Sequence, residues 1–367
     1  MNWIRDLAAT AIVAGLMAPA AAMTDAEVDE LRAQFQNVIN GLNEDSFDRF
    51  NRAISKKDMT ARIFGGRLIE PDVKQAFSSD FGSSLQGMFV SSFPQSKSEI
   101  LGTLIDFQFS EDQGQAVVRY AASGYRYFYH VYELGLDSRG RMLIVDWLDY
   151  FQGNRFSDEA GQALVMAMPS KPSTRNMLQN KTLGDGEIFQ AGELFKAVRD
   201  KEAERFFQIF DGLDPALLKE PMVLRLNLQL SLVFPESPRA ANAVQMIVDT
   251  FPDDHLNSLR LVNHFIANRQ YQEAIDAIER FQAGSGIRDG AMESVKSAAA
   301  LAMGNTGDAE KYALQATVVE PSLELGWWSL LRARTRAEDY DGATEALTQL
   351  EDEFGHTLDA EKLRRDR

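Results

Sequence analysis

The chain has 367 residues, of which 45% are apolar and 25% are charged, a balance typical of a folded protein with a sizeable core. Its formal net charge of −16 repels phosphate backbones, so we expect no nucleic acid partner. No cysteine occurs, which excludes disulfides, cysteine nucleophiles and thiolate metal sites.

The N-terminal residues carry the pattern of a signal peptide. Arg5 precedes an apolar or small run from Leu7 to Met17, and Ala20 and Ala22 fit the −3 and −1 positions of a cleavage site. The run is shorter than the roughly 20 residues that a membrane-spanning helix needs. We therefore predict a signal peptide over residues 1–22, cleavage after Ala22, and a bacterial periplasmic or secreted protein without stable membrane insertion. An uncleaved anchor is the alternative.

Residues 23–168 are predicted to form an α+β domain. Thr24 and Glu27 have the spacing of a capping box, and apolar residues follow at helical intervals. Further along, aromatic and β-branched segments alternate with short turn sequences, which indicates an antiparallel meander. The predicted strands cover residues 100–109, 115–121, 125–134 and 141–151.

The third predicted strand has two different faces. Alternation assigns Tyr129 and Val131 to one face and Phe128, His130 and Tyr132 to the other. Four tyrosines lie close to His130 in the sequence. We expect His130 to be either a hydrogen-bonded packing residue or a catalytic base.

Helices followed by a long meander resemble the cone-shaped fold of nuclear-transport-factor-like and ketosteroid-isomerase-like proteins. The resemblance concerns the order of elements over residues 24–160, without a diagnostic motif. It implies a pocket between sheet and helices, where a carboxylate or histidine does acid/base work in the family's enzymes. Candidates for that role are Asp106, His130, Asp146 and Asp149, of which at most one of Asp146 and Asp149 is expected to point inward.

The composition changes again after this domain. Proline, serine and glycine between residues 169 and 187 predict a linker. Helical periodicity then continues over residues 188–357, and residues 358–367, which end in arginines, are predicted as a polar C-terminal cap.

Alanines recur in the helical region at intervals close to 34 residues. They are Ala203, Ala240, Ala274, Ala309 and Ala343. A small residue lets the two helices of a hairpin approach closely where they cross, while bulky residues fill the gap to the next hairpin. The interval resembles the 34-residue period of tetratricopeptide repeats. The sequence thus predicts a multidomain protein, with the N-terminal α+β domain followed by an all-α solenoid of about five hairpins.

Other positions strengthen the resemblance to tetratricopeptide repeats. The turn, terminal and packing positions are filled by Tyr271, Gly304, Pro321, Trp327 and Tyr340. No unit is complete, so a Sel-like or other α-hairpin repeat remains open.

A stack of such hairpins exposes a groove lined by the first helix of each unit. Asparagine and arginine at its exposed positions predict binding of a protein or peptide through its backbone or carboxylates. The predicted partner-binding residues are Asn257, Arg260, Asn263, His264, Asn268, Arg332, Arg334 and Arg336. Solvated helix faces without a ligand are the alternative.

No phosphate-binding loop, zinc-ligand spacing, nucleophile elbow or calcium loop occurs, so we predict no cofactor, no metal and no catalytic residue. The leading hypothesis is a periplasmic adaptor or scaffold that binds protein. The alternative is a ligand-binding or enzymatic cone whose repeats mediate assembly, and a structural envelope component is a third possibility. A deep pocket with a buried carboxylate beside His130 would favour the enzyme; a cone filled by Phe and Tyr side chains would favour the adaptor.

Overall fold

The computed structural model describes residues 23–65, 70–79, 89, 101–122, 126–167, 184–200, 202–234, 236–251 and 255–356. The predicted signal peptide, most of the linker and the predicted C-terminal cap lie outside these residues and stay predictions.

The first described helices precede the sheet. The Glu27 amide donates to Oγ1 of Thr24 at 3.3 Å, and the Thr24 amide donates to Oε2 of Glu27 at 2.7 Å, so the predicted capping box is confirmed. These hydrogen bonds satisfy amides of the first helical turn and lower the pKa of Glu27. The helices are α1 (Asp25–Asn43), α2 (Asp48–Ala53), α3 (Lys56–Phe64) and α4 (Pro71–Ser79).

The sheet is an antiparallel meander in which the strands lie side by side in chain order. The four predicted strands are confirmed, and a short fifth strand follows a turn at residues 150–153. That turn ends the fourth strand before the predicted residue 151. The strands are β1 (Leu101–Ser110), β2 (Gln113–Ala122), β3 (Arg126–Leu136), β4 (Met142–Asp149) and β5 (Asn154–Arg155).

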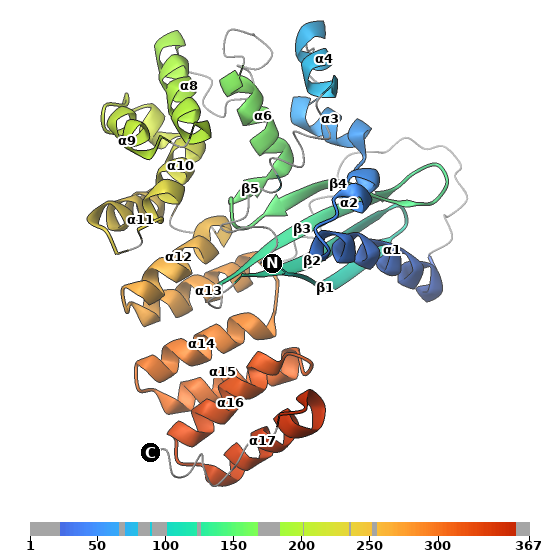
Figure 1. The fold of residues 1–367 in the computed structure, drawn as a ribbon, viewed down its shortest axis with the longest axis vertical. Coiled ribbons are helices and arrows are strands. Elements are labelled where there is room, and N and C mark those ends of the chain that lie inside the picture. Colours follow the sequence, from blue (N-terminus) through green and yellow to red (C-terminus); the bar gives the residue numbers. More distant parts are fainter. Residues whose placement is uncertain are drawn as a thin grey trace, which may run out of the picture.

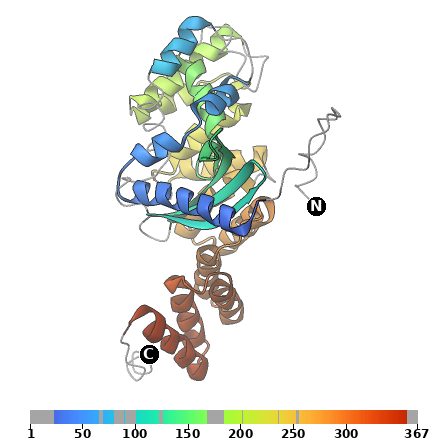
Figure 2. The ribbon, with the colours of Figure 1, turned by 90° about the vertical axis from the view of Figure 1, so that its right-hand side faces the viewer.

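Each face of the sheet packs against a different set of helices. Phe128 and Tyr132 belong to the cluster shared with α1, α2 and α3, whereas Tyr129 and Val131 face the other way, as predicted. The ring of Tyr129 lies 5.2 Å from that of Phe281 on a helix of the repeat region. Figure 2 shows the dark-blue α1 across the sheet and the yellow and orange helices behind it.

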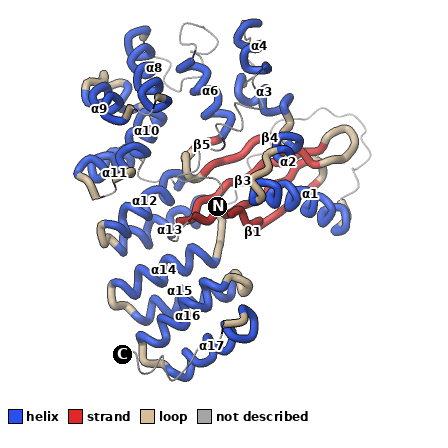
Figure 3. The backbone as a smooth tube through the Cα atoms, viewed as in Figure 1, coloured by secondary structure: helices blue, strands red, loops and turns tan. Residues whose placement is uncertain are grey.

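After the sheet, the described residues are mainly helical. From α8 onward they form ten α-helices in five consecutive pairs, visible as a column along one side of the sheet (Figures 1 and 3). Helix α8 begins inside the predicted linker. The helices are α6 (Phe156–Ala167), α8 (Asp185–Arg199), α9 (Ala203–Asp211), α10 (Pro221–Ser231), α11 (Pro238–Thr250), α12 (His255–Ala267), α13 (Tyr271–Ser285), α14 (Gly290–Ala302), α15 (Thr306–Val319), α16 (Glu324–Arg336) and α17 (Tyr340–Phe354), with a 3-10 turn at Leu217–Lys219. We call α8, α10, α12, α14 and α16 the first helices.

The turns inside the last three pairs repeat one backbone conformation. Arg269, Gly304 and Glu338 have φ values of 60°, 80° and 63°, and they lie at equivalent places between the first and second helix. The left-handed region favours glycine, yet only one of the three turns has it. Tyr271 and Tyr340 begin the second helices that follow. The repeat is therefore regular in geometry even where the glycine of the sequence pattern is missing.

Four of the five predicted crossing alanines are buried. Ala240, Ala274 and Ala309 are 0% exposed and Ala343 is 7% exposed. The prediction that Ala203 packs at a helix crossing is wrong, because this residue is exposed at the start of α9. In the first pair, the packing role falls to other residues, which include Ala191, Leu194, Ala197 and Phe206.

The sheet and the repeats share one apolar cluster. Val117, Tyr129 and Tyr150 of the sheet region pack with residues of α12, α13 and α14, such as Leu259 and Phe281. The predicted division into separate domains therefore stays a prediction, and so does the cone-fold resemblance. None of the described helices is long and apolar enough to cross a membrane.

Candidate functional site

The first-helix face predicted to bind a partner is partly internal. Asn257, Arg260 and His264 on α12 are 2%, 4% and 4% exposed, so the prediction that they are exposed is wrong. Asn263 and Asn268, also predicted, are exposed.

The turn between β4 and β5 lies against Asn257 and Arg260 of α12. Nη2 of Arg260 donates to Oε1 of Gln152 at 3.1 Å, and its Nη1 donates to the carbonyl of Arg225 at 3.3 Å. The guanidinium also lies 4.8 Å from the ring centre of Phe151. Asp149 holds the turn in shape, because its Oδ1 accepts from the amides of Phe151 and Gln152 at 2.6 and 3.0 Å.

Burial changes the pKa values of Arg260 and Glu159, which lie near this turn. Burial and the neighbouring charge of Arg225 lower the pKa of Arg260 to about 10, although Asp149 and Glu159 oppose the shift. Burial and the charge of Asp149 raise the pKa of Glu159 to about 8, although Arg260 and Arg225 oppose that shift. The guanidinium of Arg260 thus serves packing between sheet and repeats, not contact with an external carboxylate.

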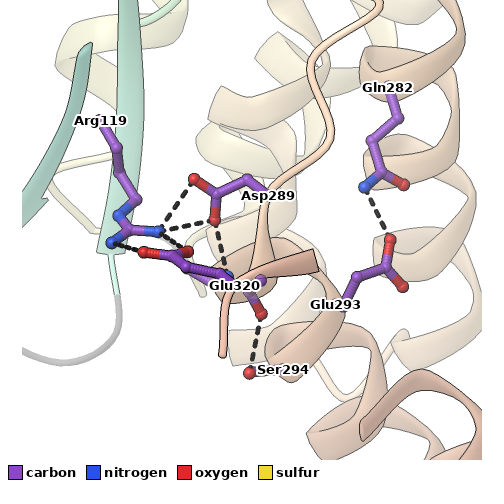
Figure 4. A network of polar contacts seen from close by, with 8 residues as sticks. Arg119, Gln282, Asp289, Glu293, Ser294 and Glu320 are labelled. Atoms are coloured by element: carbon purple, nitrogen blue, oxygen red, sulfur yellow. Dashed lines mark hydrogen bonds and ion pairs between the residues drawn. The ribbon is translucent and has the colours of Figure 1, made fainter. Parts of the chain in front are cut away.

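A second polar contact joins the sheet to the repeats further down the stack (Figure 4). Arg119 on β2 is 5% exposed; its Nη1 lies 2.9 Å from both carboxylate oxygens of Asp289, and its two terminal nitrogens lie 2.7 and 2.9 Å from the carboxylate of Glu320. Asp289 also caps α14, since its Oδ1 accepts from the Ala291 amide at 2.6 Å. One strand residue therefore binds both ends of the α14–α15 hairpin, since Asp289 precedes α14 and Glu320 follows α15.

The two carboxylates of this triad stabilise the protonated form of Arg119. Burial lowers the pKa of Arg119, but the hydrogen bonds to Glu320 and the charge of Asp289 outweigh it, so the pKa rises. Burial raises the pKa of Asp289, and Arg119 partly offsets this. None of these three residues was among the predicted site residues. A possible signal was Arg119 itself, the single charged residue of β2.

The interior of the predicted cone holds a buried polar chain. Oδ2 of Asp149 lies 3.3 Å from Nε2 of His130, Nδ1 of His130 lies 3.1 Å from the hydroxyl of Tyr132, and that hydroxyl lies 2.7 Å from the hydroxyl of Tyr120. All four side chains are at most 1% exposed. Burial raises the pKa of both tyrosines.

Aromatic rings enclose His130 on several sides. The ring centres of Tyr120, Phe89 and Trp147 lie 4.8, 5.6 and 6.4 Å from that of His130. A buried carboxylate beside His130 was expected for an enzyme, and filling by Phe and Tyr side chains was expected for an adaptor. Both features occur: Asp149 lies beside His130, and aromatic side chains fill the space around it. In this surrounding His130 is 0% exposed.

The other two catalytic candidates, Asp106 and Asp146, do not lie beside His130. Asp106 is exposed and accepts from Nε2 of Gln108 at 2.8 Å. Asp149 shares the face of His130, its partner in register, whereas Asp146 pairs with Glu133. Asp146 is nevertheless buried and accepts from Oγ of Ser157 at 2.6 Å, so it fixes the start of α6. Burial raises the pKa of Asp146.

The arginines of α16 divide into two kinds. Nε of Arg334 lies 3.0 Å from Oε1 of Glu310, and its Nη1 donates to the Gly342 carbonyl at 2.7 Å, so this side chain ties α16 to both neighbouring helices. Arg332 and Arg336 are exposed. Within the described part of the chain, neither has an ion pair or hydrogen bond. They are therefore the arginines of the predicted site that remain available to a partner.

No protein-family model matches the sequence, and no curated protein matches it. Among solved structures, the chain is similar to "MamA RS-1 ArsTM double mutant", with 16% identity and a TM-score of 0.38 over 50% of this chain and 98% of that one. It is also similar to "MamA MSR-1 C2", with 10% identity and a TM-score of 0.35 over 50% and 99%. Likenesses of this size establish no shared family.

Proposed function

We propose that this chain is an exported, protein-binding scaffold built on tetratricopeptide-like hairpins. In this proposal, the sheet region packs on part of the first-helix face and stabilises the stack. The remaining part of that face binds the partner. The protein performs no catalysis in this proposal.

The observation that carries the proposal is the unequal burial of one helix. On α14, residues from Gly290 to Ser297 are buried, but Ala298 and Ala302 nearer its C-terminal end are exposed. Arg119 of β2 contacts the stack at Asp289 before α14 and at Glu320 after α15, while the hairpins continue to α17. A face that stays open on successive first helices is the surface on which such stacks bind other proteins.

Site-specific photo-crosslinking in the native cell envelope tests this function. A photoreactive residue at Ala298 or Ala302 should capture a defined protein. The same residue at Thr344 or Thr348, exposed positions on α17, should not. If all four positions capture the same set of proteins, or none captures any, the scaffold proposal fails.

The predicted export is a separate part of the proposal. It is supported by the apolar run and the small residues before Ala22. N-terminal sequencing of the protein isolated from a bacterial periplasm should start at Met23. A chain that keeps Met1 and stays in the membrane fraction would point to an uncleaved anchor.

A catalytic cone is the second candidate, and the contact between Asp149 and His130 is the observation in its favour. Enclosure of His130 by aromatic rings argues against it. His130→Gln keeps a hydrogen-bonding side chain but removes the base. Full partner capture with no loss of a small-molecule turnover would favour the scaffold, whereas loss of such a turnover would favour the enzyme.

A further inference from the structure

Five exposed residues mark the part of the first-helix face that the sheet leaves uncovered. We call them the open face: Asn268, Ala298, Ala302, Arg332 and Arg336. Two sets of equivalent positions recur here at the 34-residue period, one through His264, Ala298 and Arg332 and the other through Asn268, Ala302 and Arg336. Equivalent positions of successive first helices lie next to each other in a stack, so these residues form one surface.

The charge of the open face contrasts with that of the rest of the molecule. Arg332 and Arg336 are one helical turn apart on α16, where like charges repel by about 0.2–0.5 kcal/mol. Within the described residues no carboxylate pairs with either of them, although the chain has an excess of acids and a net charge of −16. Arg334 between them does have carboxylate partners, Glu310 and Glu345. The two flanking arginines therefore form an unneutralised cationic pair on an acidic protein.

The neighbouring helix leaves room beside this pair. Ala298 and Ala302 project only a methyl group from α14, so an extended backbone can approach that helix closely. The side-chain amide of Asn268 borders the surface just after the C-terminal end of α12, where its Nδ2 donates to the His264 carbonyl at 2.9 Å. The surface thus has only small side chains over α14, carries positive charge along α16 and is polar at the C-terminal end of α12.

We propose that the open face binds an extended, acidic segment of a partner protein, whose carboxylates pair with Arg332 and Arg336. The inference rests on the proposed scaffold function and names the chemistry of its partner. Guanidinium groups bind carboxylates in a planar, often bidentate geometry. A short segment suits this site better than a membrane or nucleic acid, because the acidic remainder of the molecule repels a large polyanion, while charges beyond about 10 Å are screened.

Fluorescence anisotropy with designed peptides tests the partner class. Three short labelled peptides alternate alanine with glutamate, glutamine or lysine, and the mature full-length chain is titrated into each. Only the glutamate peptide should bind, and added salt should weaken its binding. Exposed ion pairs contribute about 0.2–1 kcal/mol each, so Arg332→Ala with Arg336→Ala should weaken binding roughly two- to thirtyfold.

A matched control removes two cations elsewhere. Lys57 on α3 and Arg139 beyond β3 are exposed, so Lys57→Ala with Arg139→Ala changes net charge equally and should leave the affinity unchanged. Equal loss in both double variants would mean a general charge effect and would overturn the proposal. So would equal binding of the glutamine peptide, or co-sedimentation of the chain with phosphatidylglycerol vesicles that depends on Arg332 and Arg336.

Photo-crosslinking separates this inference from the scaffold function. If Ala298 captures a partner but the crosslinked segment is neutral or basic, the acidic class is wrong and the scaffold stands. If the glutamate peptide binds but no protein is captured, the surface is cationic as proposed and the scaffold function is wrong.

Discussion

Gln152 and Arg260 meet in the boundary between the sheet region and the repeats, where Nη2 of Arg260 donates to Oε1 of Gln152 at 3.1 Å. Both side chains are at most 9% exposed. Through this contact, the part of the first-helix face nearest the sheet is occupied by the chain itself. In the proposed function, a partner therefore binds to the later helices of the stack.

Arg119 should be essential for stability. Arg119→Ala leaves Asp289 and Glu320 side by side without their cation, and breaking a buried ion pair in this way costs about 3–5 kcal/mol. Urea denaturation at neutral pH measures the loss. Adding Asp289→Asn and Glu320→Gln to Arg119→Met removes the unpaired charges and should restore most of the stability. A loss below about 1 kcal/mol for Arg119→Ala would show that the triad does not hold the two regions together.

The repeats should not fold as well without the sheet. A fragment that begins at Asp185 would expose the apolar surface that α12, α13 and α14 bury against β2 and β3, which includes Leu259, Val262 and Phe281. We expect it to bind an apolar dye and to unfold with low cooperativity, and addition of residues 23–167 should reverse both effects. Cooperative unfolding of the fragment at the midpoint of the full chain would contradict the shared core.

The crossing alanines give a matched pair of variants. Ala274 is 0% exposed between α12 and α13, so Ala274→Leu overpacks the crossing and should cost about 1–3 kcal/mol in denaturant unfolding. Ala203 is exposed at the start of α9, and Ala203→Leu should change stability by less than about 0.5 kcal/mol. Equal effects at the two positions would argue against the hairpin crossing at Ala274.

Glu159 should make stability depend on pH. Its pKa is raised to about 8 in the folded chain from an ordinary value of 4.5, so the folded state binds the proton more tightly than the unfolded state does. The stability that this proton confers is present below about pH 4.5 and is lost as pH rises through about 8.

Glu159→Gln removes this titration. Because Glu159 is half-buried and retains some contact with water, we expect the variant to be more stable than the parent by about 1–2 kcal/mol at pH 9 and nearly equal to it at pH 4. Urea midpoints across this range measure the difference, with the exposed Glu353→Gln as control. Parallel pH profiles for the parent and Glu159→Gln would contradict the raised pKa.

Local sequence patterns were sufficient for most of the elements. The capping box at Thr24, the four long strands and the buried alanines from Ala240 to Ala343 follow from signals that lie within a few residues or one repeat of each other. The failure at Ala203 has a local cause too, since spacing alone cannot tell the start of a helix from its crossing point.

What the sequence could not determine is which equivalent positions are covered. His264 and Arg332 occupy the same place in their repeat units, yet His264 is buried and Arg332 is exposed. A 34-residue period encodes contacts between neighbouring hairpins, and it contains no information about a sheet formed more than a hundred residues earlier in the chain. The sequence by itself therefore determined the hairpins and the strands. Only the tertiary structure decided which part of the first-helix face remains open, because burial there depends on contacts between segments far apart in the chain.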